Sequence, residues 1–507
     1  MIEDQVRMKP VQATAWSGAL VRYGCLAAAL ICASMTVGNV MVPVAAWLAP
    51  VFLLRFVRQS LPLPGLGLGA LALATGHVIA WYPVLPFQGW MRVAVPGALG
   101  LAFFVPYVID RWLSPRLRGL AATLVFPSAW AACEYLIMQL GFGSWGAIGY
   151  SQYGNLPLLQ LLSVTGLTGL TFLIGWFAAC ANQAWEARFA TPRLWWPLLA
   201  CAGVIAAVLL AGGLRVAAPQ GVVATVRVAG VTIDNMAVFL NTWRPLSYGT
   251  PLTAAQAEAA REQTQELHRT LLEHSRAEAR SGAKLIVWSE SNALVLKQDE
   301  ADFIRAGRRL AQEEGVYLFM TMATITPGEP LAENKLVVVD PQGQVRGAYL
   351  KSHPAPGESS ITGKGRMGIL DTPYGRIAWA ICYDFDFPGL VRQAGRAGAD
   401  IMINPSWDNA AITPMHSYMA SLRSVETGAS MFRQVNDGLS LAVNGHGRTL
   451  GMMDHASGTG EVRTFVADLP VKGVHTLYSR LGDAVPLLSA MVLAALVIVA
   501  RRNTGAA

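Results

Sequence analysis

Three side chains that together can perform covalent acyl chemistry lie close to the ends of predicted strands. Glu290 follows the apolar run KLIVW, Lys351 follows GAYL, and Cys382 follows RIAWAI. In open α/β sheets, sites form where the carboxyl ends of strands meet. A thiol needs a neighbouring base or cation to become a nucleophile at neutral pH. We therefore expect Glu290 to accept the thiol proton, Lys351 to stabilise the attacked carbonyl oxygen, and Cys382 to form a thioester.

Cys382 is also the one cysteine that falls outside the predicted membrane spans. A lone thiol in an oxidising compartment is open to unwanted oxidation, so its presence favours a function. A small buried core residue is the alternative for Cys382, and a solvated strand-end charge is the alternative for Glu290 or Lys351 taken singly. The three residues together favour chemistry. The remaining cysteines are Cys25, Cys32, Cys133, Cys180 and Cys201.

The composition indicates a membrane protein with a water-exposed part. Of 507 residues, 53% are hydrophobic and 14% charged, against about 25% charged in an average soluble domain. Charges are sparse before Arg215, dense over 225–480 and nearly absent over 481–500. We therefore predict a membrane domain at 1–216, a catalytic domain at 217–480, and a C-terminal membrane helix with a short tail at 481–507.

Eight stretches approach the roughly 20 apolar residues that cross a bilayer. The uncharged run at 23–54 leaves open whether the first two are separate helices or one long tilted helix, and the parity of the topology depends on it. The predicted spans lie near 22–38, 40–56, 63–82, 93–110, 118–139, 158–182, 194–214 and 484–500.

The basic residues of the loops predict the orientation. Cytoplasmic loops are enriched in Lys and Arg, and the basic clusters fall on alternate loops. We predict a multi-pass protein of the bacterial inner membrane, with both termini cytoplasmic, the catalytic domain periplasmic and no cleaved signal peptide. The clusters are Arg7, Lys9 and Arg22; Arg55 and Arg58; Arg111, Arg116 and Arg118; Arg188 and Arg193; and Arg501 and Arg502.

The charged region alternates short β-rich runs with helical patterns, which predicts an α/β layered domain. Two helices stand out, at 253–283 and 414–428. The predicted strands lie at 222–231, 284–288, 316–323, 335–339, 376–381, 400–403 and 439–443.

Three short motifs resemble those of the nitrilase superfamily, whose triad is Glu, Lys and Cys: WSE at 288–290, YLKSH at 349–353 and ICYD at 381–384. The resemblance implies an αββα layered fold for the catalytic domain. The wider chain is similar to the membrane-embedded branch of that superfamily, apolipoprotein N-acyltransferase. Further similar segments are GFGSWGAIGYSQ at 141–152, HSYMASLRSVETGASMFRQVNDG at 416–438 and LYSRLGDAVPLL at 477–488.

This resemblance implies a two-step acyl transfer. Cys382 is expected to take an acyl chain from a phospholipid, typically phosphatidylethanolamine, and to pass it to the α-amine of the diacylglyceryl-cysteine of an apolipoprotein. A thioester reacts readily with an amine, and shielding by lipid limits its loss to water. The resemblance also implies supporting roles for Glu358, Tyr383 and Asp384, and a substrate contact for Trp243, for which ordinary packing is the alternative.

Two other functions remain open. The run CYDFDFP also resembles soluble amidases, and Glu358 follows Lys351 by one residue fewer than is usual for the N-acyltransferases. These features favour a membrane-tethered amidase, which needs only water as acceptor. A non-enzymatic scaffold that binds lipoproteins is the third reading, against which the intact triad counts.

Several signals are discounted. The eight histidines show no metal-ligand spacing, so no metal and no cofactor are expected, and His353 and His416 are interpreted as structural. The arginines form no stripe, which excludes a nucleic-acid partner. The run GKGRMG at 363–368 is interpreted as a loop rather than a dinucleotide site. Glu134 lies in a span and is open to a functional or a structural interpretation. A monomer is the default.

Overall fold

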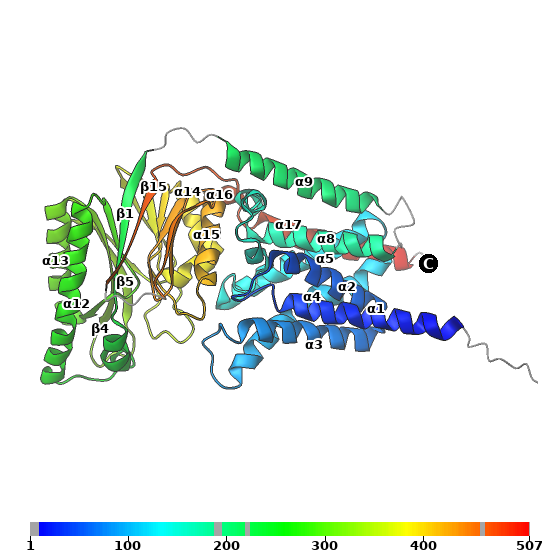
Figure 1. Cartoon of the computed structure of the whole chain (residues 1–507), viewed down its shortest axis with the longest axis horizontal. Helices are drawn as coiled ribbons and strands as arrows, with labels where there is room; N and C mark the ends of the chain where they lie inside the picture. Colours follow the sequence, from blue (N-terminus) through cyan, green and yellow to red (C-terminus); the bar gives the residue numbers. More distant parts are fainter. Residues whose placement is uncertain (1–9, 187–194, 219–223, 457–461, 506–507) are drawn as a thin grey trace, which may run out of the picture.

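The computed structural model describes residues 10–186, 195–218, 224–456 and 462–505. It has two parts that lie end to end (Figure 1). One is a bundle of long helices, called here the helical bundle. The other contains two β-sheets with helices on both sides, called here the sheet domain. The sheet domain follows the helical bundle in sequence, and the chain returns to the bundle for its last helix.

The helical bundle is built from apolar helices that lie side by side. Between α5 and α8, residues 138–166 form short turns and short helices, among them the π-turn η2 and the 3-10 turn η3. This part of the chain is called here the re-entrant segment. The bounds are α1 Pro10–Ala33, α2 Pro43–Gln59, α3 Pro62–Trp81, α4 Met91–Leu113, α5 Leu120–Ile137, η2 Met138–Phe142, η3 Ile148–Gln152, α6 Leu156–Leu159, α7 Leu162–Thr165, α8 Leu167–Glu186, α9 Trp196–Ala217 and α17 Ala484–Gly505.

Each of the eight predicted spans contains a helix, but fewer of these helices meet the length and composition of a full span. Within the described residues, five helices do so, and a sixth if 156–165 and 167–186, bent by 116°, are taken as one broken span. The first two predicted spans differ because α2 has only 17 residues and the described apolar part of α1 is Gly18–Ala33. The structure does settle that 23–54 forms two helices rather than one.

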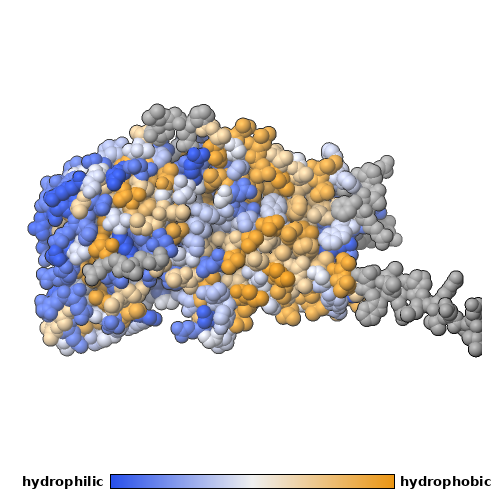
Figure 2. Space-filling view, in the orientation of Figure 1, coloured by the Kyte–Doolittle hydropathy of each residue, from blue (hydrophilic) through white to orange (hydrophobic). Residues whose placement is uncertain are grey.

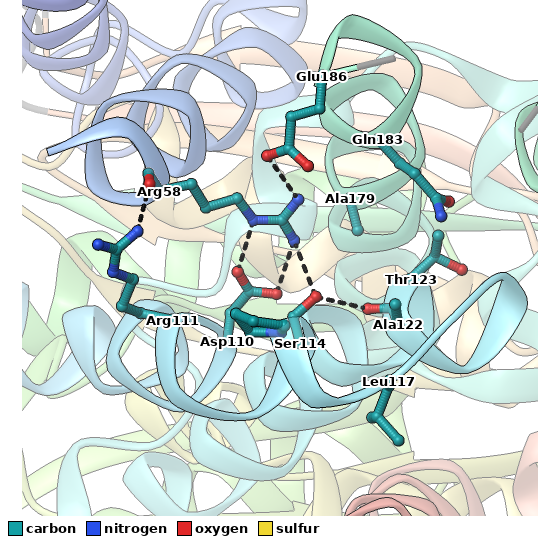
Figure 3. A pocket seen from close by; sticks show the side chains of 11 residues that line it. Arg58, Asp110, Arg111, Ser114, Leu117, Ala122, Thr123, Ala179, Gln183 and Glu186 are labelled. Carbon is teal, nitrogen blue, oxygen red and sulfur yellow. Dashed lines mark hydrogen bonds and ion pairs between the residues drawn. The ribbon is translucent and has the colours of Figure 1, made fainter. Parts of the chain in front are cut away.

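Ion pairs and hydrogen bonds join the helices at the end of the bundle farthest from the sheets. Arg58 of α2 donates from Nε and Nη2 to the carboxylate of Asp110 of α4, at 2.8 and 2.9 Å. Glu186 of α8 lies 3.5 Å from the same guanidinium, and Arg111 donates to the carbonyl oxygens of Arg58 and Ser60. These groups line a cavity of about 400 Å³ (Figure 3).

The sheet domain has two main sheets. The seven-stranded sheet has the order β15-β1-β2-β4-β5-β6 with β3 beside β4, and the six-stranded sheet has the order β14-β13-β11-β9-β8-β7. The bounds are β1 Thr225–Ile233, β2 Leu285–Trp288, β3 Ala293–Leu296, β4 Tyr317–Ile325, β5 Glu333–Val339, β6 Val345–Leu350, β7 Gly368–Thr372, β8 Gly375–Trp379, β9 Ile401–Ile403, β10 Ser406–Trp407, β11 Ser430–Arg433, β12 Val435–Asn436, β13 Leu439–Val443, β14 Thr449–Asp454 and β15 Val462–Pro470.

Helices cover the outer face of each sheet. Side chains of α12 (Ala254–Arg280) and α13 (Glu300–Glu314) share a core with one face of the seven-stranded sheet, and the other face packs on the six-stranded sheet. Helices α14 (Pro388–Ala397) and α15 (Met415–Thr427) cover the far side of that second sheet (Figure 1). The predicted αββα layering is therefore confirmed, and so is the multi-helix part that precedes it.

The α15 layer also joins the sheet domain to the helical bundle. Met415, Met419, Leu422 and Val425 of α15 belong to the same buried cluster as side chains of α1 to α8. Figure 2 shows hydrophobic residues gathered over the helical bundle and hydrophilic residues over the α12 and α13 end. Helix α15, which corresponds to the helix predicted at 414–428, is therefore buried between the sheet domain and the helical bundle.

The predicted strands and the two predicted helices of the sheet domain are all present. Residues 222 and 223 of the first predicted strand lie outside the described residues. Helix α12 begins with a capping box, in which Thr253 and Gln256 satisfy each other's backbone N–H groups, and such boxes mark helix starts in sequence. Several strands were not predicted, among them the short or polar strands β7, β11 and β14.

Candidate active site

Glu290, Lys351 and Cys382 meet between the two sheets at the carboxyl ends of their strands. Glu290 lies two residues after β2, Lys351 directly follows β6, and Cys382 begins the 3-10 turn η7 (Cys382–Asp386) after β8. Their exposed fractions are 3%, 2% and 4%. The predicted placement at strand ends is what the structure shows.

The ammonium group of Lys351 is held between two carboxylates. Its Nζ donates to Glu290 Oε1 at 2.7 Å and to Glu358 Oε2 at 2.6 Å. Asn334 Nδ2 donates to the same two carboxylates, at 2.7 and 2.8 Å. The structure therefore places the predicted supporting residue Glu358 beside Lys351. Asn334 was missed, because one polar residue within strand β5 carries no sequence signal.

Cys382 adopts a backbone conformation that is rare for its residue type. Its φ of +46° lies in the left-handed region, where a residue with a side chain is strained and where functional residues are often found. Its N–H donates to Pro405 O at 2.9 Å, and its Sγ lies 3.7 Å from Trp407 O. The Trp407 N–H donates to Glu290 Oε2 at 2.8 Å. The thiol and the carboxylate of Glu290 thus contact the same residue.

Burial and charge set the protonation of this cluster. Burial raises the pKa of the Cys382 thiol well above its usual value, Glu290 raises it further and Lys351 opposes both. Burial alone lowers the pKa of Lys351, but Glu290 and Glu358 outweigh it and the pKa is raised. Burial raises the pKa of Glu358, and Lys351 more than offsets this, so the net pKa is lowered. Before any reaction, Cys382 is a neutral thiol beside a charged lysine.

Asp384 connects the nucleophile turn to the loop that carries Lys351. It is fully buried, and its carboxylate accepts from Tyr349 OH at 2.6 Å, from the His353 N–H at 2.8 Å and from the N–H groups of Ser352 and Ile381. All of these groups donate hydrogen bonds to the Asp384 carboxylate, which is not exposed to solvent. Asp384 therefore holds two loops in register and has no access to a reacting group.

Tyr383 and Trp243 lie in different surroundings. The Tyr383 ring meets Phe387 edge-on, with centroids 5.3 Å apart, and lies 6.4 Å from the ring of Trp145 of the helical bundle. Trp243 is fully buried in a separate cluster that includes Leu294. The structure thus brings Tyr383 to the junction with the bundle, and a substrate contact by Trp243 stays a prediction.

Glu134 is hydrogen-bonded inside the bundle. Its Oε1 accepts from Thr171 Oγ1 of α8 at 2.8 Å, and its Oε2 accepts from the Ile148 N–H at 3.3 Å. Ile148 belongs to the re-entrant segment that reaches the sheet domain. Glu134 therefore links that segment to helix α8 by hydrogen bonds.

One group beside the site has the composition of a metal-binding set. Ligand atoms of Cys382, Asp408 and His416 lie within 4.8 Å of one another. However, His416 Nδ1 is bonded to Asp408 Oδ1 at 2.7 Å and Nε2 to Asp386 Oδ2 at 2.8 Å, and Arg433 Nη2 lies 3.0 Å from Nδ1. A carboxylate oxygen faces each ring nitrogen, and Asp408 also accepts from Arg433, so these side chains fit a cluster of ion pairs better than a set of metal ligands.

The αββα fold with its buried Glu, Lys and Cys defines a protein of the carbon-nitrogen hydrolase class. The Carbon-nitrogen hydrolase family model matches residues 252–474. The Apolipoprotein N-acyltransferase N-terminal domain model matches residues 23–180. The chain belongs to the apolipoprotein N-acyltransferase family.

Curated relatives agree with this family along most of the chain. An apolipoprotein N-acyltransferase of Geobacter metallireducens is 27% identical over 412 residues, 72% of each chain. One from Gloeobacter violaceus is 26% identical over 500 residues, 90% of this chain and 89% of that one. Among solved structures, an amidase from Nesterenkonia sp. is 20% identical, with a TM-score of 0.38 over 50% of this chain and 95% of that one.

Proposed function

We propose that this protein moves an acyl chain from a phospholipid to the N-terminal amine of a diacylglyceryl-cysteine apolipoprotein, through a thioester on Cys382. The observation that carries the proposal is the buried contact of Lys351 with Glu290 next to that thiol. The family membership and the relatives' names support the acyltransferase over the amidase.

In the first step, Glu290 takes the thiol proton and Cys382 Sγ attacks the ester carbonyl of the phospholipid. The ester C–O bond breaks, and the lysophospholipid leaves with the proton that Glu290 returns. An ammonium has three protons, and two of those of Lys351 face Glu290 and Glu358. The third proton, with the backbone N–H of Tyr383, stabilises the oxyanion.

In the second step, the amine of the apolipoprotein attacks the thioester carbonyl. Glu290 accepts a proton from the amine, the C–S bond breaks, and Glu290 returns the proton to the departing sulfur, which regenerates the thiol of Cys382. Glu358 keeps Lys351 charged and in place, and Asp384 keeps the two loops together. Tyr383 lies beside the nucleophile, where we propose that it borders the acyl chain, and Trp243 is proposed as a more distant substrate contact.

The test is an intact-mass measurement on the purified full-length protein in detergent. With phosphatidylethanolamine, we expect a gain of one acyl chain that hydroxylamine removes and that Cys382→Ala lacks. Addition of a diacylated lipopeptide discharges it and yields N-acylated peptide. If folded protein gains no acyl chain, the amidase becomes the better reading, and small amides are the next substrates.

The orientation is part of the same proposal. We place the protein in the bacterial inner membrane as a monomer, with both termini cytoplasmic and the catalytic domain periplasmic. The start of α1 and the end of α17 lie together at the end of the bundle away from the sheets (Figure 1). There the basic residues Arg58, Arg111 and Arg116 also lie, as cytoplasmic ends favour. Arg7, Lys9, Arg188 and Arg193 of the predicted pattern lie outside the described residues.

The domain limits 1–216, 217–480 and 481–507 are proposed with this orientation. A reporter fused at residue 300 distinguishes the two possibilities. Activity of a reporter that works only in the periplasm supports the proposed orientation, whereas activity of a cytoplasmic reporter at that position overturns it.

A further inference from the structure

Four charged side chains form a buried group close to Cys382 and have no part in the proposed chemistry. His416 joins Asp408 and Asp386, one through each ring nitrogen, at 2.7 and 2.8 Å. Arg433 Nη2 donates to both oxygens of Asp408, at 3.0 and 3.1 Å. None of the four is more than 3% exposed. This set, called here the ion cluster, holds two cations and two carboxylates and is charge-balanced when His416 is protonated.

The ion cluster reaches the backbone on both sides of the nucleophile. Arg433 Nη1 donates to Asn404 Oδ1, and Asn404 Nδ2 donates to Ala380 O at 3.1 Å and to Cys382 O at 3.5 Å. At its other end, the ion cluster holds the side chain of Asp386, the last residue of η7. The turn that begins with Cys382 is thus fixed at its first and its last residue.

The same turn is fixed from the helical bundle. Ser144 of the re-entrant segment donates from its N–H and its Oγ to the carbonyl oxygen of Asp386, both at 2.8 Å. Gly143 has φ +60°, and a Cβ there would lie 2.5 Å from that carbonyl oxygen. The Trp145 ring packs on His416, with centroids 5.6 Å apart. The segment therefore contacts both the backbone of Asp386 and the ion cluster.

A second contact holds the re-entrant segment to the sheet domain. Arg423 Nη2 of α15 donates to Tyr150 OH at 2.9 Å, and the same hydroxyl is hydrogen-bonded to Ser144 Oγ. Arg423 is fully buried. Ser144 is therefore locked by partners from both parts of the molecule.

A strained backbone conformation persists only when its surroundings over-determine it. Cys382 at φ +46° is such a case. The contacts that hold its turn run without a break from Ser144 through Asp386, His416, Asp408, Arg433 and Asn404. Removing one member of a buried ion cluster leaves an unpaired charge and is strongly destabilising, so the members of the cluster hold one another in place.

We infer that Ser144, Asp386 and His416 are positioning residues, through which the seated re-entrant segment of the bundle holds the Cys382 turn in its reactive conformation. The inference rests on the proposed function only in calling that conformation reactive toward lipid. It assigns the helical bundle a direct part in preparing the nucleophile. A purely structural ion cluster differs in one respect, because its loss lowers stability without changing thiol reactivity in the folded protein.

The experiment measures the rate at which iodoacetamide alkylates Cys382 in the full-length protein in detergent, with peptide mass spectrometry to separate it from the other five cysteines. The variants are Ser144→Ala, His416→Gln and both together. The matched control is Gln160→Met, which removes another hydrogen bond between bundle and sheet domain, from Gln160 Nε2 to His446 O at 2.9 Å. Thermal unfolding of each variant is recorded in parallel.

We expect each single variant to lower the alkylation rate about tenfold, because the reactive conformation of the turn becomes less populated. The double variant changes it no more than the larger single effect, because the two residues act through one chain of contacts. Gln160→Met has the wild-type rate. Wild-type rates in folded Ser144→Ala and His416→Gln, additive effects, or an equal effect of Gln160→Met overturn the inference.

If Ser144→Ala or His416→Gln does not fold, Asp386→Asn takes its place, because it keeps the shape and removes the charge. Alkylation needs no acyl donor, so a failure of the proposed function and a failure of this inference are distinguishable. Altered alkylation without acyl gain in the wild type supports the positioning role and overturns the acyltransferase. Acyl gain in the wild type, together with wild-type alkylation rates in the variants, supports the acyltransferase and overturns the positioning role.

Discussion

Lys351 Nζ lies 2.7 Å from Glu290 Oε1 in a place where neither residue is more than 3% exposed. In the proposed mechanism, this position lets Glu290 accept the proton of the neighbouring thiol. We predict that Glu290→Gln, which keeps the shape, lowers the rate of acyl gain at Cys382 by about 10²–10⁴-fold. The measurement is the intact-mass time course with phospholipid.

The control for this substitution is Glu333→Gln, whose carboxylate pairs with Lys297 and Lys335 instead of Lys351. Its acylation rate should match that of the wild type. A Glu290→Gln variant that keeps more than a tenth of the wild-type rate contradicts the role of Glu290 as base.

Asp384 is predicted to contribute to stability through the two loops it joins. Asp384→Asn places an amide N–H₂ group opposite donors such as Tyr349 OH and the His353 N–H. Because a buried donor without an acceptor is costly, we expect a loss of about 3 kcal/mol of stability. Chemical denaturation measures it, with Asp371→Asn on the exposed surface as control. Equal stability of the two variants contradicts the prediction.

Features that depend on neighbours in sequence were predictable. The strand-end positions of Glu290 and Cys382 follow from apolar runs that stop at polar residues, and α12 follows from its composition. The layered fold was predicted because strands and helices alternate along the chain. The resemblance of short motifs supplied the pairing of these residues into one site.

Features that depend on distant segments were not predictable. The interpretation of His416 as a structural residue agrees with its hydrogen bonds, but its partners Asp408 and Asp386 could not be predicted, because they meet its ring only through the fold. Asn334 was missed for a similar reason. The second predicted span, 40–56, contains α2, which runs from Pro43 to Gln59 and with 17 residues is shorter than the roughly 20 that cross a bilayer.

The protonation of His416 makes stability depend on pH. Burial lowers the pKa of His416, but the carboxylates of Asp408 and Asp386 outweigh burial and the opposing charge of Arg433, and raise the pKa to about 9. The unfolded value is about 6.5. Because the folded pKa is the higher one, this contribution to stability is complete below about pH 6.5 and is lost as the pH rises through about 9.

The measurement for this pH effect is the thermal midpoint between pH 6 and pH 10. The midpoint of the wild type should fall more steeply across this range than that of His416→Gln, which carries no titrating ring. Parallel curves for the two proteins show that His416 does not hold its proton through the cluster.

Asp110 is predicted to be needed for the stability of the helical bundle. Asp110→Ala leaves the Arg58 guanidinium with two long contacts, to Glu186 and to Ser114 Oγ, each at 3.5 Å (Figure 3). An unpaired buried charge costs about 3–5 kcal/mol, whereas replacing both partners by apolar residues is often neutral. We therefore expect Asp110→Ala to lower the yield and thermal midpoint, and Arg58→Met with Asp110→Leu to recover most of the loss. Glu186→Gln is the control, since Glu186 is 43% exposed, and a double variant no more stable than Asp110→Ala contradicts the explanation.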